Sequence, residues 1–367
     1  MVSIVIGGDF CPHKEESSLD KFKNISTLFR GADYSIVNLE CPIDSDLTYR
    51  PIRKIGPNLR SYLLPSQLLV PLGVSAVTLA NNHFKDYGSD CCQETLKLLK
   101  NANINTVGAG TNIEEAKSIL YETLNDITVA FINSCENEFS IATSKDSGAN
   151  PVNSIQQYYD IQKARQKADV IIVIVHGGIE MYNLPTPKMQ ERYRFFIDCG
   201  ADIVVNHHQH CYSGREIYKG KHIYYGLGNL YFPRLGKANK IWEEGFLIKI
   251  ILDKKTIVDV VLIPFTQSYE KGICIGDSFE FAENFKRLSQ ICSNSEDVKR
   301  QYDKLCACET NTYNFINPYK GRILRGLARR GYIPSFISKE SLLELLGKIR
   351  CESHYDRFVK FIENRII

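Results

Sequence analysis

Five apolar segments of this sequence each end in side chains that can bind a metal ion or carry a proton. In chain order these side chains are Asp9, Asn38 with Glu40, Asn81 to His83 with Asp86, His176 with Glu180, and the run His207 to His210. Carboxylate, amide oxygen and imidazole together favour Mn²⁺, Fe²⁺, Zn²⁺ or Mg²⁺ over a soft metal. Such an ion lowers the pKa of water and stabilises charge on a phosphoryl or acyl oxygen. The residue types therefore predict metal-assisted chemistry.

The segments that precede these residues have the composition of buried strands. They are VSIVIGG at 2–8, YSIVNLE at 34–40, VSAVTLA at 74–80, DVIIVIVHGG at 169–178 and ADIVVNHHQH at 201–210. Ligands bind at the carboxyl ends of strands in open α/β sheets, so we expect one convergent cluster. On an extended strand, His208 and His210 would share one face while Gln209 points away.

Helical segments alternate with these strands as far as about residue 210, and hairpins follow. Helices are expected at about 16–30, 66–72, 89–102, 154–168 and 187–199, and hairpin turns at Asn125-Asp126, Lys219-Gly220 and Asp253-Lys254. This order predicts a layered α/β sandwich with a mixed sheet over residues 1–267. Residues 268–367 are predicted to form a mainly helical C-terminal region.

Composition excludes several classes of protein. With 44% hydrophobic and 24% charged residues in 367, the chain is globular rather than disordered. It has no apolar run long enough to span a membrane and no secretory signal, so we expect a cytoplasmic protein. A net charge of +3 and the lack of a binding motif argue against nucleic acid as a partner. The 12 cysteines have no paired spacing and are expected to be free, buried thiols.

The C-terminal region carries the excess positive charge. Residues 319–330 mix four arginines with apolar residues in a pattern typical of an amphipathic helix. Such a helix either packs by its apolar side or makes weak contact with an anionic membrane surface.

The strand-end residues also carry a resemblance to a known family. The set Gly8-Asp9, Asn38-Leu39-Glu40, Ala80-Asn81-Asn82-His83 with Asp86 and Gly88, His176-Gly177-Gly178 with Glu180, and His207-His208-Gln209-His210 resembles the CapA family. Pro185, Gln190, Gly200-Ala201-Asp202 and the segment Tyr225 to Asn229 support it. Proteins of this family act in capsule or poly-γ-glutamate biosynthesis and are similar to calcineurin-like metallophosphoesterases. The resemblance covers about residues 2–265.

The resemblance implies a four-layer αββα sandwich with a site for one or two divalent metal ions. It places Asp9 and His210 on one metal, and Asn82, His176 and His208 on the other, with Glu40 bridging. It makes His83 the general acid, oriented by Asp86; the alternative for His83 is a structural role. Metallophosphoesterases usually open with Asp-x-His, whereas Phe10 and Cys11 follow Asp9 here, so a single-metal centre is the alternative.

An anionic small molecule or polymer is the expected substrate. Arg53 and Lys54 lie in a long loop at 41–65 close to Glu40 and are predicted to bind it, although a solvated loop is the alternative. Asn38, Glu180 and His207 complete the predicted substrate-binding set. The expected function is hydrolysis of a phosphoester, or of a γ-glutamyl or other amide bond, by metal-activated water with His83 as acid. The alternative is a non-catalytic accessory protein that binds an anionic polymer or a partner enzyme.

Overall fold

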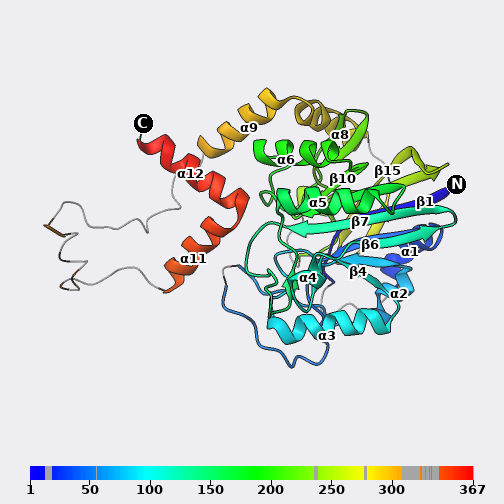
Figure 1. Ribbon diagram of the computed structural model, residues 1–367, viewed down its shortest axis with the longest axis horizontal. Coiled ribbons are helices and arrows are strands. Elements are labelled where there is room, and N and C mark those ends of the chain that lie inside the picture. The colour runs from blue at the N-terminus through cyan, green and yellow to red at the C-terminus, as the bar shows by residue number, and fades with distance from the viewer. Residues whose placement is uncertain are drawn as a thin grey trace.

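The computed structural model describes residues 1–12, 19–54, 56–234, 239–276, 279–307, 323–324, 327, 330, 332 and 339–366. Two β-sheets pack face to face with helices on both outer sides (Figure 1). Alternate residues of the first strand enter different cores. Ile4 and Ile6 face the other sheet, whereas Val5 packs with the helices on the outer face of its own sheet. The predicted four-layer sandwich is confirmed.

The first sheet has eight strands in the order β16-β15-β14-β1-β2-β3-β4, with β13 also beside β1. Its strands are β1 (Val2–Phe10), β2 (Tyr34–Leu39), β3 (Ala76–Thr78), β4 (Asn105–Val107), β13 (Asn229–Tyr231), β14 (Glu244–Asp253), β15 (Thr256–Ser268) and β16 (Gly272–Ile275). The strands β1 to β4 run parallel, whereas β14 is antiparallel to β1. The sheet is therefore mixed, as predicted.

The second sheet has six strands in the order β11-β12-β10-β9-β7-β6. They are β6 (Leu120–Leu124), β7 (Ile127–Cys135), β9 (Val170–His176), β10 (Ile203–His207), β11 (Arg215–Tyr218) and β12 (Lys221–Tyr224), and β5 (Ala109–Gly110) pairs separately with β8 (Gly148–Ala149). Hairpin turns between β6 and β7 and between β11 and β12 lie at the predicted places. The turn between β14 and β15 lies one residue later than predicted, at Lys254-Lys255.

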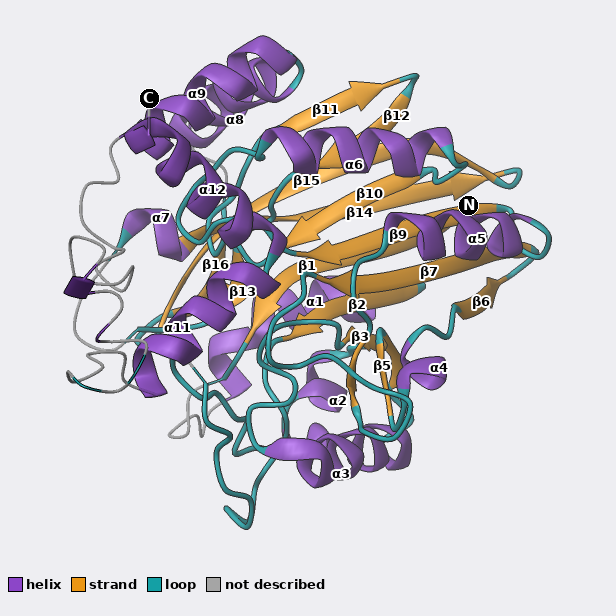
Figure 2. Ribbon diagram, turned by 60° about the vertical axis from the view of Figure 1, so that its left-hand side comes forward, coloured by secondary structure: helices purple, strands orange, loops and turns teal. Residues whose placement is uncertain are grey.

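Helices cover the outer faces of both sheets (Figure 2). Those over the first sheet are α1 (Lys23–Arg30), α2 (Leu69–Leu72) and α3 (Gly88–Asn101); those over the second are α5 (Ser154–Arg165) and α6 (Pro187–Asp198). The short helices α4 (Ile113–Ala116) and α7 (Lys240–Glu243) lie in connections, and 3₁₀ turns cover Leu19–Phe22 and Pro65–Gln67. Pro187 begins α6, and Thr186 caps it by accepting a hydrogen bond from the Met189 N–H over 3.2 Å.

The strand ends meet at one edge of the sandwich. Asp9 is in register with Asn38 in the first sheet, and His176 is in register with His207 in the second. The expectation of an extended strand through residue 210 is wrong, because β10 ends at His207. His208 and His210 have φ values of 90° and 55°, positive values that are uncommon for non-glycine residues.

The C-terminal region is helical where it is described, with α8 (Phe279–Cys292), α9 (Ser295–Ala307), α11 (Lys339–Arg350) and α12 (Glu352–Ile366). It packs onto the sandwich, since Phe285 and Leu288 of α8 join the core of the second sheet. The first sheet continues past residue 267 through β16, and the proposed division at that residue stays a prediction. Most of the predicted amphipathic segment 319–330 lies outside the described residues. Within the described part of the chain, every helix is too short or too polar to cross a bilayer.

Candidate metal centre

The strand ends bring together two overlapping groups of metal-ligand side chains. One group is Glu40, His176 and His208, and the other is Asp9, Glu40 and His210. In each group one ligand atom of every residue lies within 4.8 Å of the others, and all the residues are buried. Either group could therefore hold a metal ion, and Glu40 belongs to both.

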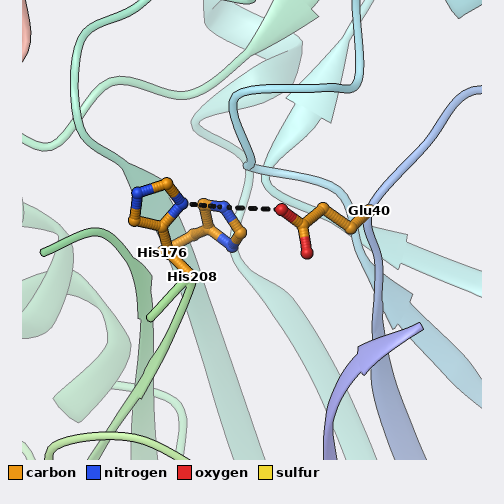
Figure 3. A group of neighbouring side chains, drawn as sticks. All are labelled: Glu40, His176 and His208. Carbon is orange, nitrogen blue, oxygen red and sulfur yellow. Dashed lines mark hydrogen bonds and ion pairs between the residues drawn. The ribbon is translucent and has the colours of Figure 1, made fainter. Parts of the chain in front are cut away.

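Glu40 has a buried carboxylate without the hydrogen bonds that burial normally requires. Neither oxygen accepts a hydrogen bond from the residues that the structure describes. The Nε2 atoms of His176 and His210 lie 3.5 and 3.6 Å from Oε1 of Glu40, and Figure 3 shows the His176 imidazole facing this carboxylate. A buried carboxylate without a donor is costly unless it is protonated or binds a cation. The donor set therefore fits a divalent ion.

Asn38 orients ligands of both groups. Its Nδ2 donates to Oδ1 of Asp9 over 2.7 Å and lies 3.2 Å from Nδ1 of His176. Its Oδ1 accepts hydrogen bonds from Thr78 and Asn81, each over 3.2 Å. Because the side chain is fully buried and engaged by these protein groups, we interpret Asn38 as a positioning residue rather than the substrate-binding residue that we expected.

The remaining predicted ligands lie close to His176 and to the turn after β10. Oδ1 of Asn82 and Nδ1 of His208 lie 3.0 and 3.1 Å from Nε2 of His176. On the other side, Nδ1 of His210 lies 2.9 Å from Oδ1 of Asn229. This grouping agrees with the division of ligands that the resemblance implies, and the assignment of each residue to a metal stays a prediction.

Burial favours the neutral forms of these side chains in the metal-free protein. It raises the pKa of Asp9 to about 7 and holds the pKa of Glu40 well above its usual range. It lowers the pKa of His208 and of His210 to about 3, and that of His176 well below its ordinary value. A cation that binds here must displace the carboxyl protons.

Metal affinity is consequently expected to fall as the pH falls below about 7, where Asp9 takes up its proton. Each displaced proton lowers the apparent affinity about tenfold per pH unit. Calorimetric titration of the metal-free protein with Mn²⁺ from about pH 6 to about pH 8, in buffers of different ionisation enthalpy, measures both the affinity and the protons released. Equal affinity across this range would contradict the expectation.

His83 stands beside the two groups and contacts Asp86 and Lys54. Its Nδ1 lies 2.6 Å from Oδ2 of Asp86 and 3.0 Å from Nζ of Lys54, and Lys54 forms an ion pair with Asp86. Burial lowers the pKa of His83, the hydrogen bond with Asp86 opposes this effect, and the charge of Lys54 lowers the pKa further. With Nδ1 engaged, Nε2 is the nitrogen left to exchange a proton with a bound group.

A cavity of about 180 Å³ adjoins His83 and Asn82. Its lining comes from distant parts of the chain, because Lys54 lies in the early loop whereas Lys348 and His354 belong to α11 and α12. The carboxylates of Glu138 and Glu180 line the same cavity. The cavity thus combines both signs of charge next to the metal-ligand groups.

The residues that were predicted to bind substrate separate in the structure. Lys54 and Glu180 line the cavity. Arg53 does not, since its side chain is 58% exposed and pairs with Glu340. His207 is buried in β10 and belongs neither to the metal-ligand groups nor to this lining among the described residues.

Sequence reasoning missed the site residues Asn229, Glu138, Lys348 and His354. Asn229 follows the hairpin of β11 and β12 and was noted only as support for the resemblance, so its position near a strand end was the available signal. Glu138 lies three residues after the end of β7 at Cys135, so its position after a strand was the available signal there too. Lys348 and His354 lie on C-terminal helices, where no strand-end pattern points to them.

The chain is similar to bacterial capsule proteins. A family model described as "Bacterial capsule synthesis protein PGA_cap" matches residues 3–234, which include every strand-end motif. The capsule biosynthesis protein CapA of Bacillus anthracis is 31% identical over 293 residues, which are 77% of this chain and 70% of that protein. The PGA biosynthesis protein CapA of Bacillus subtilis (strain 168) is 31% identical over 216 residues, which are 58% of this chain and 57% of that protein.

Among solved structures, a novel phosphatase from Mycoplasma pneumoniae overlaps with a TM-score of 0.47 at 14% sequence identity. The overlap covers 77% of this chain and 96% of that one. At this level of similarity nothing follows about activity.

Proposed function

This chain belongs to the bacterial capsule synthesis protein PGA_cap family, and from that premise we propose that it is a metal-dependent hydrolase. Its proposed reaction is cleavage of a phosphoester, or of a γ-glutamyl or other amide bond, in the synthesis of capsule or another surface polymer. The observation that carries the proposal is the buried carboxylate of Glu40, which lacks a hydrogen-bond donor among the described residues and faces two imidazoles.

The residues proposed to hold the ions are the ones that surround this carboxylate. Asp9 and His210 would hold one ion, Asn82, His176 and His208 the other, and Glu40 would contact both. A divalent ion supplies positive charge that stabilises a developing oxyanion and lowers the pKa of water. Asn38 keeps Asp9 and His176 in place through its hydrogen bonds.

His83 is proposed to donate the proton that the leaving group takes up. Asp86 accepts the hydrogen bond at Nδ1 and thereby fixes the ring, so Nε2 carries the transferred proton. Lys54 pairs with Asp86, and its ammonium group lies at the wall of the cavity. An anionic group would be held there by Lys54 and by the bound cations, which offset the carboxylates of Glu138 and Glu180.

The activity test uses the full chain loaded with Mn²⁺, Zn²⁺ or Mg²⁺ and checked by elemental analysis. Phosphomonoesters, phosphodiesters and γ-glutamyl peptides are the substrates to try. Release of phosphate or glutamate that stops with a chelator supports the hydrolase. If the loaded protein cleaves none of them but binds poly-γ-glutamate or a partner enzyme, the accessory role is the correct one.

Lys54→Met is expected to move the alkaline limb of the kcat/KM profile to higher pH and to raise KM. Loss of the positive charge beside Nδ1 raises the pKa of His83, so the protonated acid persists at higher pH. Arg53→Met is the matched control, because Arg53 is exposed and pairs with Glu340 outside the cavity; its profile should equal that of the wild type. A limb that stays in place or moves to lower pH in Lys54→Met would count against the role of His83 as acid.

A further inference from the structure

A third group of metal-ligand side chains lies where the C-terminal helices meet the sandwich. Glu138 follows β7, Cys351 occupies the bend between α11 and α12, and His354 lies in the first turn of α12. A carboxylate oxygen, the thiol sulfur and an imidazole nitrogen of these residues lie within 4.8 Å of one another. Cys351 is fully buried and the other two are half-buried. The group shares no residue with the two groups around Glu40.

We propose that Glu138, Cys351 and His354 bind a zinc ion. Thiolate, imidazole and carboxylate are the three ligand types that Zn²⁺ takes in proteins, at about 2.0–2.3 Å. Mg²⁺ and Ca²⁺ prefer oxygen ligands only, so the thiol selects against them. Three protein ligands leave a fourth position of a tetrahedral ion open. Glu138 and His354 are half-buried and line the cavity, so the open position of the ion would face the cavity.

Hydrogen bonds between the loop after β7 and the start of α12 hold the three proposed ligands close together. Glu136 accepts hydrogen bonds from Oγ of Ser353 over 2.7 Å, from its backbone N–H over 3.3 Å, and from the thiol of Cys351 over 3.2 Å. Glu352 accepts from the backbone N–H and the side chain of Asn137, over 2.9 and 2.8 Å. The backbone that carries the three ligands is therefore positioned before any ion binds, which reduces the cost of assembling a metal site. Because its thiol donates a hydrogen bond to Glu136, a purely structural role is the alternative for Cys351.

The proposed zinc site is connected to the centre around Glu40. Asn82 is close enough to Glu138 to lower the pKa of that carboxyl, against the larger effect of burial, while its Oδ1 lies 3.0 Å from Nε2 of His176. His354 is close enough to His208 to lower the pKa of that residue, after the larger effect of burial. An ion here would offset the negative charge of Glu138 at the wall of the cavity, which reduces the repulsion of an anionic group, and would tie α11 and α12 to the sandwich. The inference concerns metal binding alone and holds whether or not the proposed hydrolase activity exists.

Cobalt substitution tests the inference without any turnover. The full-length metal-free protein is titrated with Co²⁺, and thiolate coordination is read from the sulfur-to-cobalt charge-transfer absorption in the near ultraviolet. We expect this band in the wild type and its loss in Cys351→Ser, together with the loss of one equivalent of zinc by elemental analysis. Cys11→Ser is the matched control, because Cys11 is a buried thiol close enough to Glu40 to raise its pKa but lies outside all three groups. It should retain both the band and the zinc.

For the two cysteine variants, two results would overturn the proposal. One is a Cys351→Ser variant whose cobalt absorption and zinc content equal those of the wild type. The other is loss of the band in Cys11→Ser. His354→Gln, at a half-buried position, keeps the test decisive if Cys351→Ser does not fold: it should weaken zinc binding at least about tenfold, and unchanged zinc affinity would overturn the proposal as well.

Discussion

Replacement of His83 by alanine is expected to lower turnover about 10²–10⁴-fold and to leave the metal content of the protein unchanged. His83 contacts Asp86 and Lys54 but belongs to none of the groups of metal-ligand side chains. The substitution therefore removes a proton donor and no ligand. Steady-state kinetics and elemental analysis on the same preparation measure the two quantities together.

His222→Ala is the control for this substitution. His222 is half-buried in β12, packs on Tyr224, and is in register with Ile203 at the start of β10, the end away from the site. The His222→Ala variant should have the same turnover rate as the wild type. If His83→Ala lost its metal together with its activity, the imidazole would be needed for the metal, and the general-acid role would be wrong.

Replacement of Glu40 by glutamine is expected to weaken metal binding at least about 100-fold while the metal-free protein stays as stable as the wild type or becomes more stable. In the metal-free protein the carboxylate is buried without a donor among the described residues, and both burial and the nearby Asp9 raise its pKa. An amide of nearly the same volume has no charge to desolvate. Calorimetric metal titration gives the affinity, and denaturant unfolding in the presence of a chelator gives the free energy of unfolding.

Glu216→Gln is the matched control, because Glu216 is a buried carboxylate with partners. It pairs with Arg194 at 2.7 Å and accepts a hydrogen bond from Tyr225 over 2.6 Å. Its substitution should lower the free energy of unfolding, since it leaves Arg194 without its counter-charge, and should not change metal affinity. The hypothesis of a bridging ligand fails if Glu40→Gln behaves like Glu216→Gln and retains its metal.

The metal-ligand groups could be anticipated because parallel strands end at a common edge. Once 2–8 and 34–40 are interpreted as buried parallel strands of one sheet, the residues at their ends must lie near each other. The register of Asp9 with Asn38 bears this out. His176 ends a strand of the second sheet and comes close to Asp9 because the two sheets pack face to face. The turn after β10 could not be anticipated in this way, because the backbone of His208 and His210 is left-handed. Their rings reach the cluster from a turn and not from a strand face.

The loop at 41–65 shows where sequence patterns stop being informative. Arg53 and Lys54 are neighbours of the same charge, yet Lys54 is buried against Asp86 while Arg53 faces solvent and pairs with Glu340. An irregular segment has no period that assigns its side chains to one face. The contacts of Lys54 depend on the position of the turn that carries His83 and Asp86, which lies about 30 residues further along the chain.

The sequence by itself determined the layered α/β architecture and pointed to the strand-end side chains that could hold a metal ion, because hydrophobic periodicity and strand direction are local properties. Only the tertiary structure decided that the helices of the predicted C-terminal region line the cavity through Lys348 and His354. It also brought Cys351 beside Glu138, although the spacing of the 12 cysteines in the sequence had not suggested a ligand. These contacts form between segments more than 200 residues apart by the docking of helices on the sandwich, and such docking depends on the shape of the packed faces, which no short stretch of sequence encodes.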